Sequence, residues 1–239
     1  MAGSAPEAGP GWDARASLDE LRAVIDPADV RGRKNRVIDL TQKRALRTGL
    51  GDVRGRRILD VGCGSGRITT WLRSAGAQVI GVEPSELMLR HARTLDRQLP
   101  VAVGVGQLPV RTGSVDAVVV VTVLQYLLAE PAEARKLGRE VARVLRPGGR
   151  FVALEQVTAK PLGRGGAAEE YAEALAAGGL EIVEVRGVRV AASRAMRVAL
   201  ALPVPGGLAA AALMREARGW EASADPYAEV LFVARTRGP

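Results

Sequence analysis

The chain has 239 residues, of which 47% are hydrophobic and 25% charged, as in an ordinary globular protein with one large domain. Its single cysteine, Cys63, excludes an intrachain disulfide and fits a reducing cytoplasm. The amino-terminal segment lacks the apolar core of a secretory signal, and the longest apolar runs, 115–128 and 198–213, are interrupted or too short for a membrane span. We therefore expect a cytoplasmic protein without a membrane partner.

The net charge of +8 is concentrated in one segment. Residues 31–57 contain ten basic and two acidic side chains, so the segment carries +8 and the remainder of the chain sums to zero. Such a segment can attract an anionic partner, although charge patterning alone favours a solvated helix face.

The first fifty residues contain no strand pattern. Residues 1–16 are rich in Gly, Ala, Pro and Ser and are predicted to be disordered. Residues 17–50 are predicted to be helical: a short helix capped by Ser17 ends at Asp26-Pro27, and a second runs over about 34–48 until the glycines at 49 and 51. Helical periodicity places three residues of the second helix on one face: Ile38, Thr41 and Ala45.

From residue 51 onwards, apolar runs alternate with helical patterns, which predicts one domain over 51–239. The predicted strands are 57–61, 78–82, 101–105, 116–121, 150–156, 180–190 and 229–235. The predicted helices are 68–75, 86–98 with Ser85 as its cap, 131–145 and 167–177. This alternation favours parallel pairing with right-handed crossovers, and the valine run at 116–121 indicates a strand covered on both faces. The sequence therefore predicts an α/β fold with a doubly wound, mostly parallel, seven-stranded sheet.

A glycine-rich turn follows the first predicted strand, in Ile58-Leu59-Asp60-Val61-Gly62-Cys63-Gly64-Ser65-Gly66. In open α/β sheets ligands bind beyond the carboxyl ends of the strands, and glycines let the backbone approach them closely. The dinucleotide pattern G-x-G-x-x-G fails here, because the third glycine position is occupied by Arg67. Glu83 ends the second predicted strand, where a carboxylate can accept both hydroxyls of a ribose.

These segments resemble the class I S-adenosylmethionine (SAM)-dependent methyltransferase family. The resemblance covers about residues 55–160 and rests on four segments in the family's order: 59–66, 81–85 (Gly-Val-Glu-Pro-Ser), 114–119 (Ser-Val-Asp-Ala-Val-Val) and 145–151 (Leu-Arg-Pro-Gly-Gly-Arg-Phe). It implies a Rossmann-like sheet, SAM as cofactor, S-adenosylhomocysteine as product, and an N-terminal helical lid.

The resemblance also implies roles for individual residues. The methionine end of SAM would lie against the glycine loop, at Asp60, Gly62, Cys63, Gly64 and Gly66. Glu83 would bind the ribose, and the adenine would be lined by Pro84, Ser85 and Leu108. Val121 and Thr122 would lie near the sulfonium. Many relatives carry an acidic residue after the third strand, and Gln107 is the candidate to replace it here.

Residues for the methyl acceptor are less well defined by the sequence. Gln125 and Tyr126 occupy a position where many relatives have histidine, and Tyr126 could either orient an acceptor or cap the sheet edge. The only histidine, His91, is not favoured as a base, and no metal-ligand spacing is present. Arg33, Lys34 and Arg36 are candidates to hold an anionic or polar acceptor or to close over SAM.

The aliphatic segment 191–219 contains Met196, Leu200, Leu208, Leu213 and Met214 and could line a pocket or a dimer contact, but core packing is favoured. The sequence predicts methyl transfer to oxygen or nitrogen of a small molecule or peptide in bacterial biosynthesis. An RNA or protein methyltransferase and a non-catalytic SAM-binding module are the alternatives, although nucleic acid is disfavoured because aromatic residues are scarce. The acceptor and the oligomeric state are left open.

Overall fold

The computed structural model describes residues 12–18, 20–103, 107–127, 130–158, 167–190, 193–218 and 227–236. The strands are β1 (Arg57–Val61), β2 (Gln78–Glu83), β3 (Val101–Val103), β4 (Val115–Val121), β5 (Leu145–Thr158), β6 (Leu180–Val190) and β7 (Tyr227–Thr236). The helices up to β5 are α1 (Trp12–Arg15), α2 (Glu20–Val24), α3 (Arg33–Leu50), α4 (Arg67–Ser74), α5 (Glu86–Leu95), α6 (Leu124–Leu127) and α7 (Pro131–Val144). Three further helices follow, α8 (Ala168–Ala177), α9 (Arg194–Ala201) and α10 (Gly206–Glu216).

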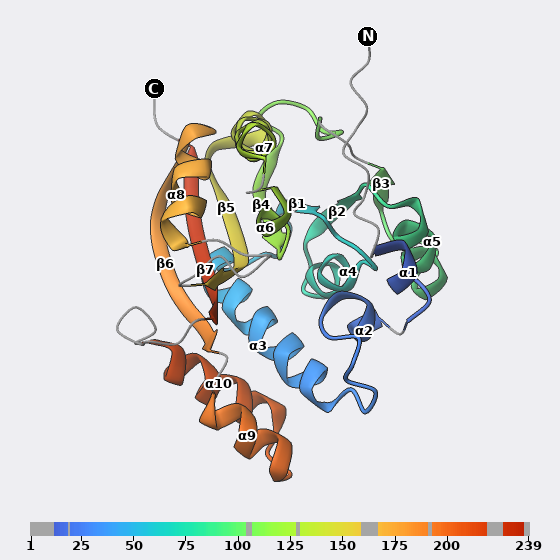
Figure 1. Cartoon of the computed structure of the whole chain (residues 1–239). Coiled ribbons are helices and arrows are strands. Elements are labelled where there is room, and N and C mark those ends of the chain that lie inside the picture. Colours follow the sequence, from blue (N-terminus) through green and yellow to red (C-terminus); the bar gives the residue numbers. More distant parts are fainter. Residues whose placement is uncertain are drawn as a thin grey trace.

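The strands form one seven-stranded sheet in the order β3-β2-β1-β4-β5-β7-β6 (Figure 1). The pairs among β1 to β5 are parallel, whereas β7 is antiparallel to both β5 and β6. The predicted mostly parallel, Rossmann-like sheet is therefore confirmed. Since β6 runs in the same direction as β5, the carboxyl ends of β1, β2, β4, β5 and β6 meet at one edge.

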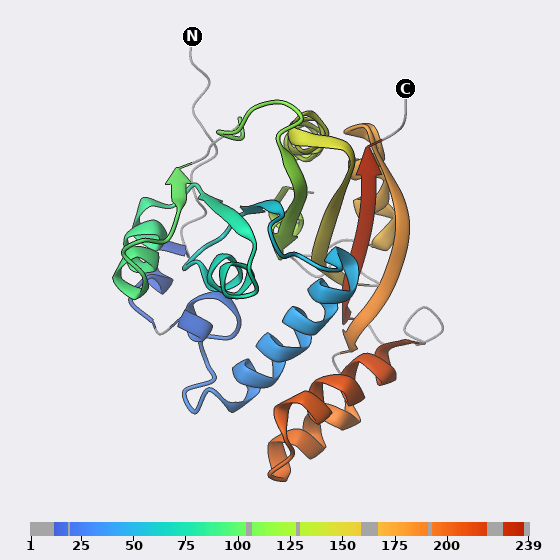
Figure 2. The same ribbon diagram turned by 180° about the vertical axis from the view of Figure 1, so that it is seen from behind.

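Helices cover both faces of the sheet, as Figure 2 shows from behind. On one face Val118 and Val120 of β4 belong to a core with α7 and α8, and on the other Ala117 and Val119 belong to a core with α3 and α4. This alternation explains the valine run of β4, because a strand with two covered faces needs apolar side chains at every position.

The N-terminal helices differ in part from the prediction. Residues 12–15 form the short helix α1 instead of disorder, whereas residues 1–11 lie outside the described part. Ser17 does not cap α2, because its hydroxyl donates to the carbonyl of Ala14 at the end of α1. Helix α3 is longer than predicted: Gly49 lies inside it, where an added Cβ would be 2.9 Å from Val152 Cγ1, and Gly51 ends it with φ 72°.

Most other boundaries agree within a few residues. The turn predicted at 147–149 lies within β5, as a bulge between the pairs Val115–Leu145 and Ala117–Arg150. The predicted third strand continues to residue 105, but residues 104 and 105 lie outside the described part. Ser85 caps α5 as predicted, accepting the N–H of Met88. Within the described ranges no helix is long and apolar enough to cross a bilayer.

Candidate functional site

The glycine loop at the carboxyl end of β1 has a backbone that other residues can hardly adopt. Gly62, Gly64 and Gly66 have φ values of 72°, 55° and 83°, in the left-handed region where a Cβ is strained. An added Cβ at Gly62 would lie 2.3 Å from Val123 Cγ2, and one at Gly66 would lie 2.2 Å from Leu99 Cδ2. The spacing G-x-G-x-G is therefore required by this turn, independently of any ligand.

Glu83 connects this loop with the turn after β2. Its carboxylate is 8% exposed and accepts the N–H of Gly64 and the N–H of Ser85, each at 3.0 Å. Each oxygen of the carboxylate thus accepts one backbone N–H, from Gly64 and from Ser85. The predicted pairing of the first two strand ends is thus present as direct contact between the glycine loop and Glu83.

Asp60 and Cys63 are buried beside the loop. Asp60 Oδ2 accepts a hydrogen bond from the Thr69 hydroxyl at 2.7 Å, and burial raises the pKa of Asp60 to about 6. Burial, together with the carboxylates of Asp60 and Glu83, raises the pKa of the Cys63 thiol well above its usual value. Cys63 therefore remains a neutral thiol, packed against β2, where an added Cβ at Gly81 would lie 2.7 Å from Cys63 Sγ.

The carboxyl end of β4 faces the glycine loop from the next strand. Thr122 has φ 55°, a left-handed value that is rare for a residue other than glycine, and its N–H donates to the carbonyl of Leu154. Thr122 and Val121 are partly exposed, and α6 begins two residues later with Leu124. The two residues predicted to lie near the sulfonium are therefore adjacent to Val123, which packs against Gly62.

A buried carboxylate holds this turn in place. Glu155 of β5 is 0% exposed and accepts the N–H groups of Val123 and Leu124 at 3.0 Å and of Gln125 at 3.4 Å. Burial raises the pKa of Glu155 to about 7, although the three hydrogen bonds favour its charged form. Glu155 thus fixes the backbone that carries the predicted acceptor residues Gln125 and Tyr126.

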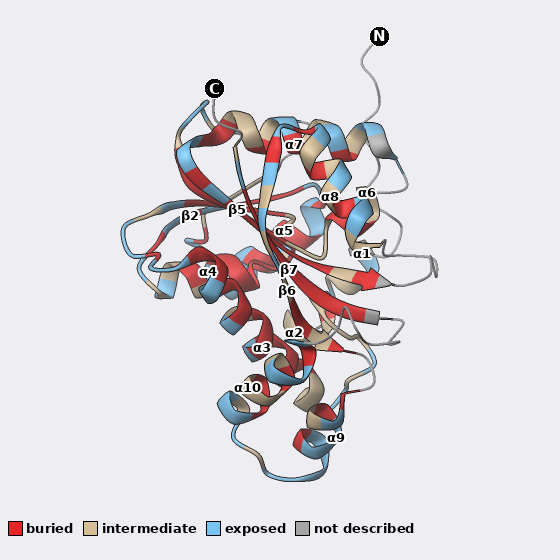
Figure 3. Cartoon of the chain, turned by 90° about the vertical axis from the view of Figure 1, so that its left-hand side faces the viewer, coloured by how far each residue is buried: buried red, intermediate tan, exposed pale blue. Residues whose placement is uncertain are grey.

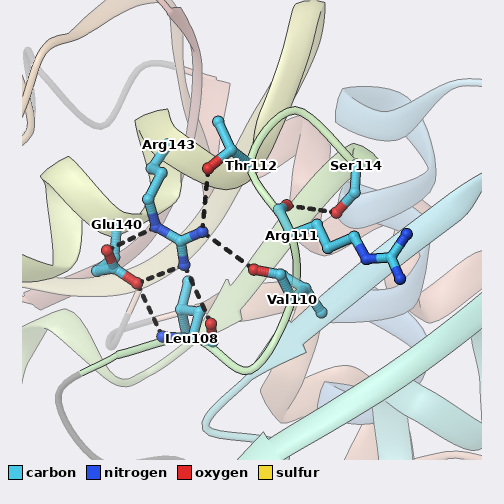
Figure 4. A network of polar contacts seen from close by, with 7 residues as sticks. All are labelled: Leu108, Val110, Arg111, Thr112, Ser114, Glu140 and Arg143. Atoms are coloured by element: carbon cyan, nitrogen blue, oxygen red, sulfur yellow. Dashed lines mark hydrogen bonds and ion pairs between the residues drawn. The ribbon is translucent and has the colours of Figure 1, made fainter.

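The connection from β3 to β4 is attached to α7 by the pair Glu140–Arg143 (Figure 4). Arg143 donates to the carbonyls of Leu108 and Val110 at 3.0 Å, while Glu140 Oε2 accepts the N–H of Leu108 at 2.9 Å. The Leu108 side chain is 7% exposed and belongs to the main core, whereas Gln107 is exposed. The structure therefore fixes Leu108 beside the β2 and β4 strands but gives Gln107 no anchoring contact among the described residues.

The N-terminal helices lie beside the candidate site. An added Cβ at Gly64 would be 3.1 Å from Val24 Cγ1, so α2 packs directly on the glycine loop, and α1 packs against α5. The three predicted lid cations are engaged near the start of α3: Lys34 pairs with Asp26 at 2.7 Å, Arg33 donates to the carbonyl of Leu202, and Arg36 donates to that of Arg31 at 3.5 Å. Pro84 is exposed and Ser85 buried at the start of α5.

A buried polar network joins the loop helix α4 through α3 to the strands β6 and β7, on the face of the sheet that α3 and α4 cover. Arg67 is 5% exposed and donates to Asp39 Oδ1 at 2.6 Å and to Gln42 Oε1 at 2.7 Å. Gln42 Nε2 donates to Glu229 Oε1 at 3.1 Å, and Arg189 pairs with the same carboxylate. Arg67, which breaks the dinucleotide pattern in the sequence, therefore has a structural partner set on α3.

Sequence reasoning missed Glu155, Val24 and this network. The sequence signal for Glu155 was its place as an acidic residue inside an apolar strand, Phe151-Val-Ala-Leu-Glu155. Burying a carboxylate in such a strand costs free energy unless hydrogen bonds compensate. Val24 and the Arg67 network carry no comparable local signal, because they depend on how distant elements pack.

Comparison with known proteins agrees with this geometry. Residues 59–153 match the methyltransferase domain family. An uncharacterised methyltransferase of Mycobacterium tuberculosis is 42% identical over 97 residues, which are 40% of this chain and 38% of that protein. The demethylmenaquinone methyltransferase of Tropheryma whipplei is 33% identical over 144 residues, 57% of this chain and 59% of that protein. The chain thus spans less than two thirds of the length of these relatives.

A solved geranyl diphosphate methyltransferase in complex with SAM is 22% identical, with a TM-score of 0.62 over 89% of this chain and 93% of that one. At this identity the likeness concerns the fold, the seven-stranded sheet with helices on both faces. Residues 59–153 therefore carry a methyltransferase domain, and the fold of the described residues agrees with that of a SAM-bound methyltransferase.

Proposed function

We propose that this chain transfers the methyl group of SAM to an oxygen or nitrogen atom of a small molecule or peptide in bacterial biosynthesis. The observation that carries the proposal is the loop of three left-handed glycines, held against the Glu83 carboxylate at the shared carboxyl edge of β1 and β2. Ligands of open α/β sheets bind at this edge.

The residues present fit SAM. The Ser65 hydroxyl in the glycine loop is 1% exposed and has no hydrogen-bond partner among the described residues, so a polar group is available to a ligand. Asp60, Gly62, Cys63, Gly64 and Gly66 would hold the methionine end, and Glu83 the ribose. Adenine contacts would come from Pro84, Ser85, Gln107 and Leu108. Val121 and Thr122 would lie near the sulfonium, which supplies an electrophilic methyl group.

On the acceptor side, the chain has to position a nucleophile and exclude water. Gln125 Oε1 is buried without a partner among the described residues, and Tyr126 follows it on α6. Both are candidates to orient an acceptor that approaches β4, with Glu155 keeping their backbone fixed. The relatives named for demethylmenaquinone and geranyl diphosphate support a small-molecule acceptor.

An RNA or protein acceptor is less well supported. Three of the ten cations in segment 31–57 are paired with carboxylates: Lys34 with Asp26, Lys43 with Asp39 and Arg54 with Asp52. This pairing reduces the positive charge that would attract a nucleic acid. No specific contact in the described ranges favours that alternative.

Titration calorimetry with SAM and S-adenosylhomocysteine tests the cofactor assignment. Glu83→Ala should weaken SAM binding at least about tenfold, because a buried charged hydrogen-bond acceptor is lost. Glu86→Ala, three residues later and exposed, is the matched control. Absence of SAM binding by the unmodified protein, or equal affinities of the two variants, would refute the assignment. Methyl transfer from labelled SAM to a panel of alcohols and amines then tests the acceptor class.

A further inference from the structure

The hairpin formed by α9 and α10 projects from the carboxyl edge of the sheet beside α3, as the two ribbon views show (Figure 1, Figure 2). Between residues 198 and 214 no side chain is polar: the sequence is Val-Ala-Leu-Ala-Leu-Pro-Val-Pro-Gly-Gly-Leu followed by four alanines, Leu213 and Met214. We call residues 198–208 the apolar tip.

Only one side of the hairpin is used for packing. Met196, Ala199, Ala209 and Leu213 form a small core with Val37 and Ile38 of α3. The outward side chains remain in water: Val198 is 49% exposed, Leu202 55% and Leu208 65%. The sequence favoured core packing for this whole segment, so the prediction is correct for Met196 and Leu213 and wrong for Leu200 and Leu208, because a helix of this length buries only one face.

Neighbouring elements extend the exposed apolar surface. Leu40 of α3 is 43% exposed, and its Cδ1 would be 2.4 Å from an added Cβ at Gly206, so it adjoins the apolar tip. Large exposed apolar residues elsewhere are distributed over β2, α5, β6 and the turn before α3, where Val30 is 77% exposed, and such scattered residues are normal on a protein surface. Four belong to the tip, Val198, Leu200, Leu202 and Leu208. Figure 3 shows the exposed segments of α9, α10 and their connection in pale blue.

Arginines surround this apolar surface. Arg36 and Arg44 lie one turn before and one turn after Leu40 on the exposed stripe of α3, and the Arg33 guanidinium donates to the carbonyl of Leu202. Arg194 and Arg197 are exposed on α9, which contains no acidic residue. The nearby carboxylates are already engaged: Glu216 accepts the Ser193 hydroxyl and the N–H of Arg194, and Asp26 pairs with Lys34.

We propose that the apolar tip and its arginines form a peripheral docking surface for an anionic lipid bilayer. The exposed leucines would insert at the level of the headgroups, and the arginines would contact the anionic headgroups. The sequence argument against a membrane partner concerned only spanning segments, whereas peripheral binding needs no such segment. The surface lies at the same edge as the candidate methyltransferase site, because β6, which leads into α9, ends there.

Charge distinguishes this occupant from a second copy of the chain. A symmetric dimer through the apolar tip would bring the same surface patch of both copies together. The arginines of one copy would then lie near those of the other, with no unengaged carboxylate on α9 to compensate. Anionic headgroups instead complement the arginines, and their attraction weakens as salt screens it.

Co-sedimentation of the full chain with vesicles tests the proposal. The vesicles contain phosphatidylglycerol mixed with phosphatidylcholine, or phosphatidylcholine alone, at about 0.1 M and about 1 M salt, where screening lengths are about 10 Å and 3 Å. Binding is expected with the anionic vesicles and is expected to weaken at high salt. Leu202→Ser combined with Leu208→Ser should lower the partition coefficient about tenfold or more. Arg194→Gln combined with Arg197→Gln should lower it about fivefold or more.

The matched control replaces two exposed leucines of α5, Leu87→Ser and Leu95→Ser, which are 40% and 53% exposed, and should leave binding unchanged. Equal melting temperatures of the variants show that folding is intact, since all four leucines face water. Failure of the chain to sediment with anionic vesicles would overturn the proposal, as would equal loss in the α5 control. Concentration-dependent dimerisation that Leu202→Ser with Leu208→Ser abolishes, without vesicle binding, would assign the surface to a second copy. Because SAM is omitted, the result is independent of the proposed methyl transfer.

Discussion

Replacing Glu155 by glutamine tests how the buried carboxylate supports the turn between β4 and α6. Glu155 is fully buried, and its pKa is raised from 4.5 to about 7, mainly by burial. An acid whose pKa is higher in the folded state stabilises the fold below its unfolded pKa, and this contribution is lost as the pH rises through the folded pKa. The rise corresponds to about 3 kcal/mol between about pH 4.5 and pH 7.

Glutamine cannot ionise, so Glu155→Gln lacks this loss. We expect its free energy of unfolding, relative to that of wild type, to increase by about 3 kcal/mol between about pH 5 and pH 8, so the variant gains relative stability. The melting temperature difference should change by about 6–12 °C in the same direction. Asp60, whose pKa is also raised, titrates in both proteins, and its contribution cancels in this difference. Chemical denaturation at each pH, with circular dichroism as readout, measures the difference.

Glu140→Gln is the matched control. The Arg143 guanidinium lowers the pKa of Glu140, so that carboxyl is ionised in both folded and unfolded chains throughout this range. Its stability difference from wild type should therefore not change with pH. If the Glu155→Gln difference were equally flat, the pKa of Glu155 would be the same in the folded and unfolded chains, and the reasoning about its burial would be wrong. Glu155→Ala, which leaves three N–H groups without an acceptor, should be about 2–3 kcal/mol less stable than Glu155→Gln.

Three other changes test the loop and its supports. Gly62→Ala combines left-handed strain with a Cβ 2.3 Å from Val123 Cγ2, so SAM binding measured by calorimetry should fall at least about tenfold. Gly113→Ala has the same sign of φ but open space around the added Cβ, so its free energy of unfolding should fall by only about 1 kcal/mol. An equal fall in the free energy of unfolding of Gly62→Ala would exclude the clash as the cause. Arg143→Met should lower the free energy of unfolding by about 2 kcal/mol, because the ion pair with Glu140 and the hydrogen bonds to two carbonyls are lost. Arg139 is exposed, so Arg139→Met should leave the free energy of unfolding unchanged. Arg67→Met should cost about 3 kcal/mol in chemical denaturation, since Asp39 and Gln42 lose a buried donor; a change below about 0.5 kcal/mol, as expected of a surface residue, would contradict this.

The parts of the fold that the sequence predicted depend on local chemistry. The strand positions followed from apolar runs, and the glycine loop from a spacing that the left-handed backbone requires. The Glu83 position followed from its place at a strand end, since parallel strands bring their carboxyl ends together. In each case the signal lies within a short stretch of the sequence.

What the sequence did not reveal depends on contacts between distant segments. Val24 meets Gly64 across forty residues, and Gln42 meets Glu229 across the whole domain. The misassigned cap at Ser17 has a similar origin, because α1, which takes its hydrogen bond, is too short to have a periodic signal. The exposed side of the α9–α10 hairpin was also hidden, since an aliphatic composition does not show which face is covered.

The two sides of the candidate site are mechanically connected through one residue. Val123 is fixed at its N–H by Glu155, and its side chain occupies the space that makes glycine necessary at position 62. A displacement of the β4–α6 turn would therefore move a side chain that packs on the glycine loop, because well-packed contacts transmit small shifts. Cofactor affinity should consequently respond to changes at Glu155, although Glu155 belongs to a different strand from the loop. Weaker SAM binding by Glu155→Ala than by Glu155→Gln would demonstrate this connection, and equal affinities would show that the loop and the turn are independent.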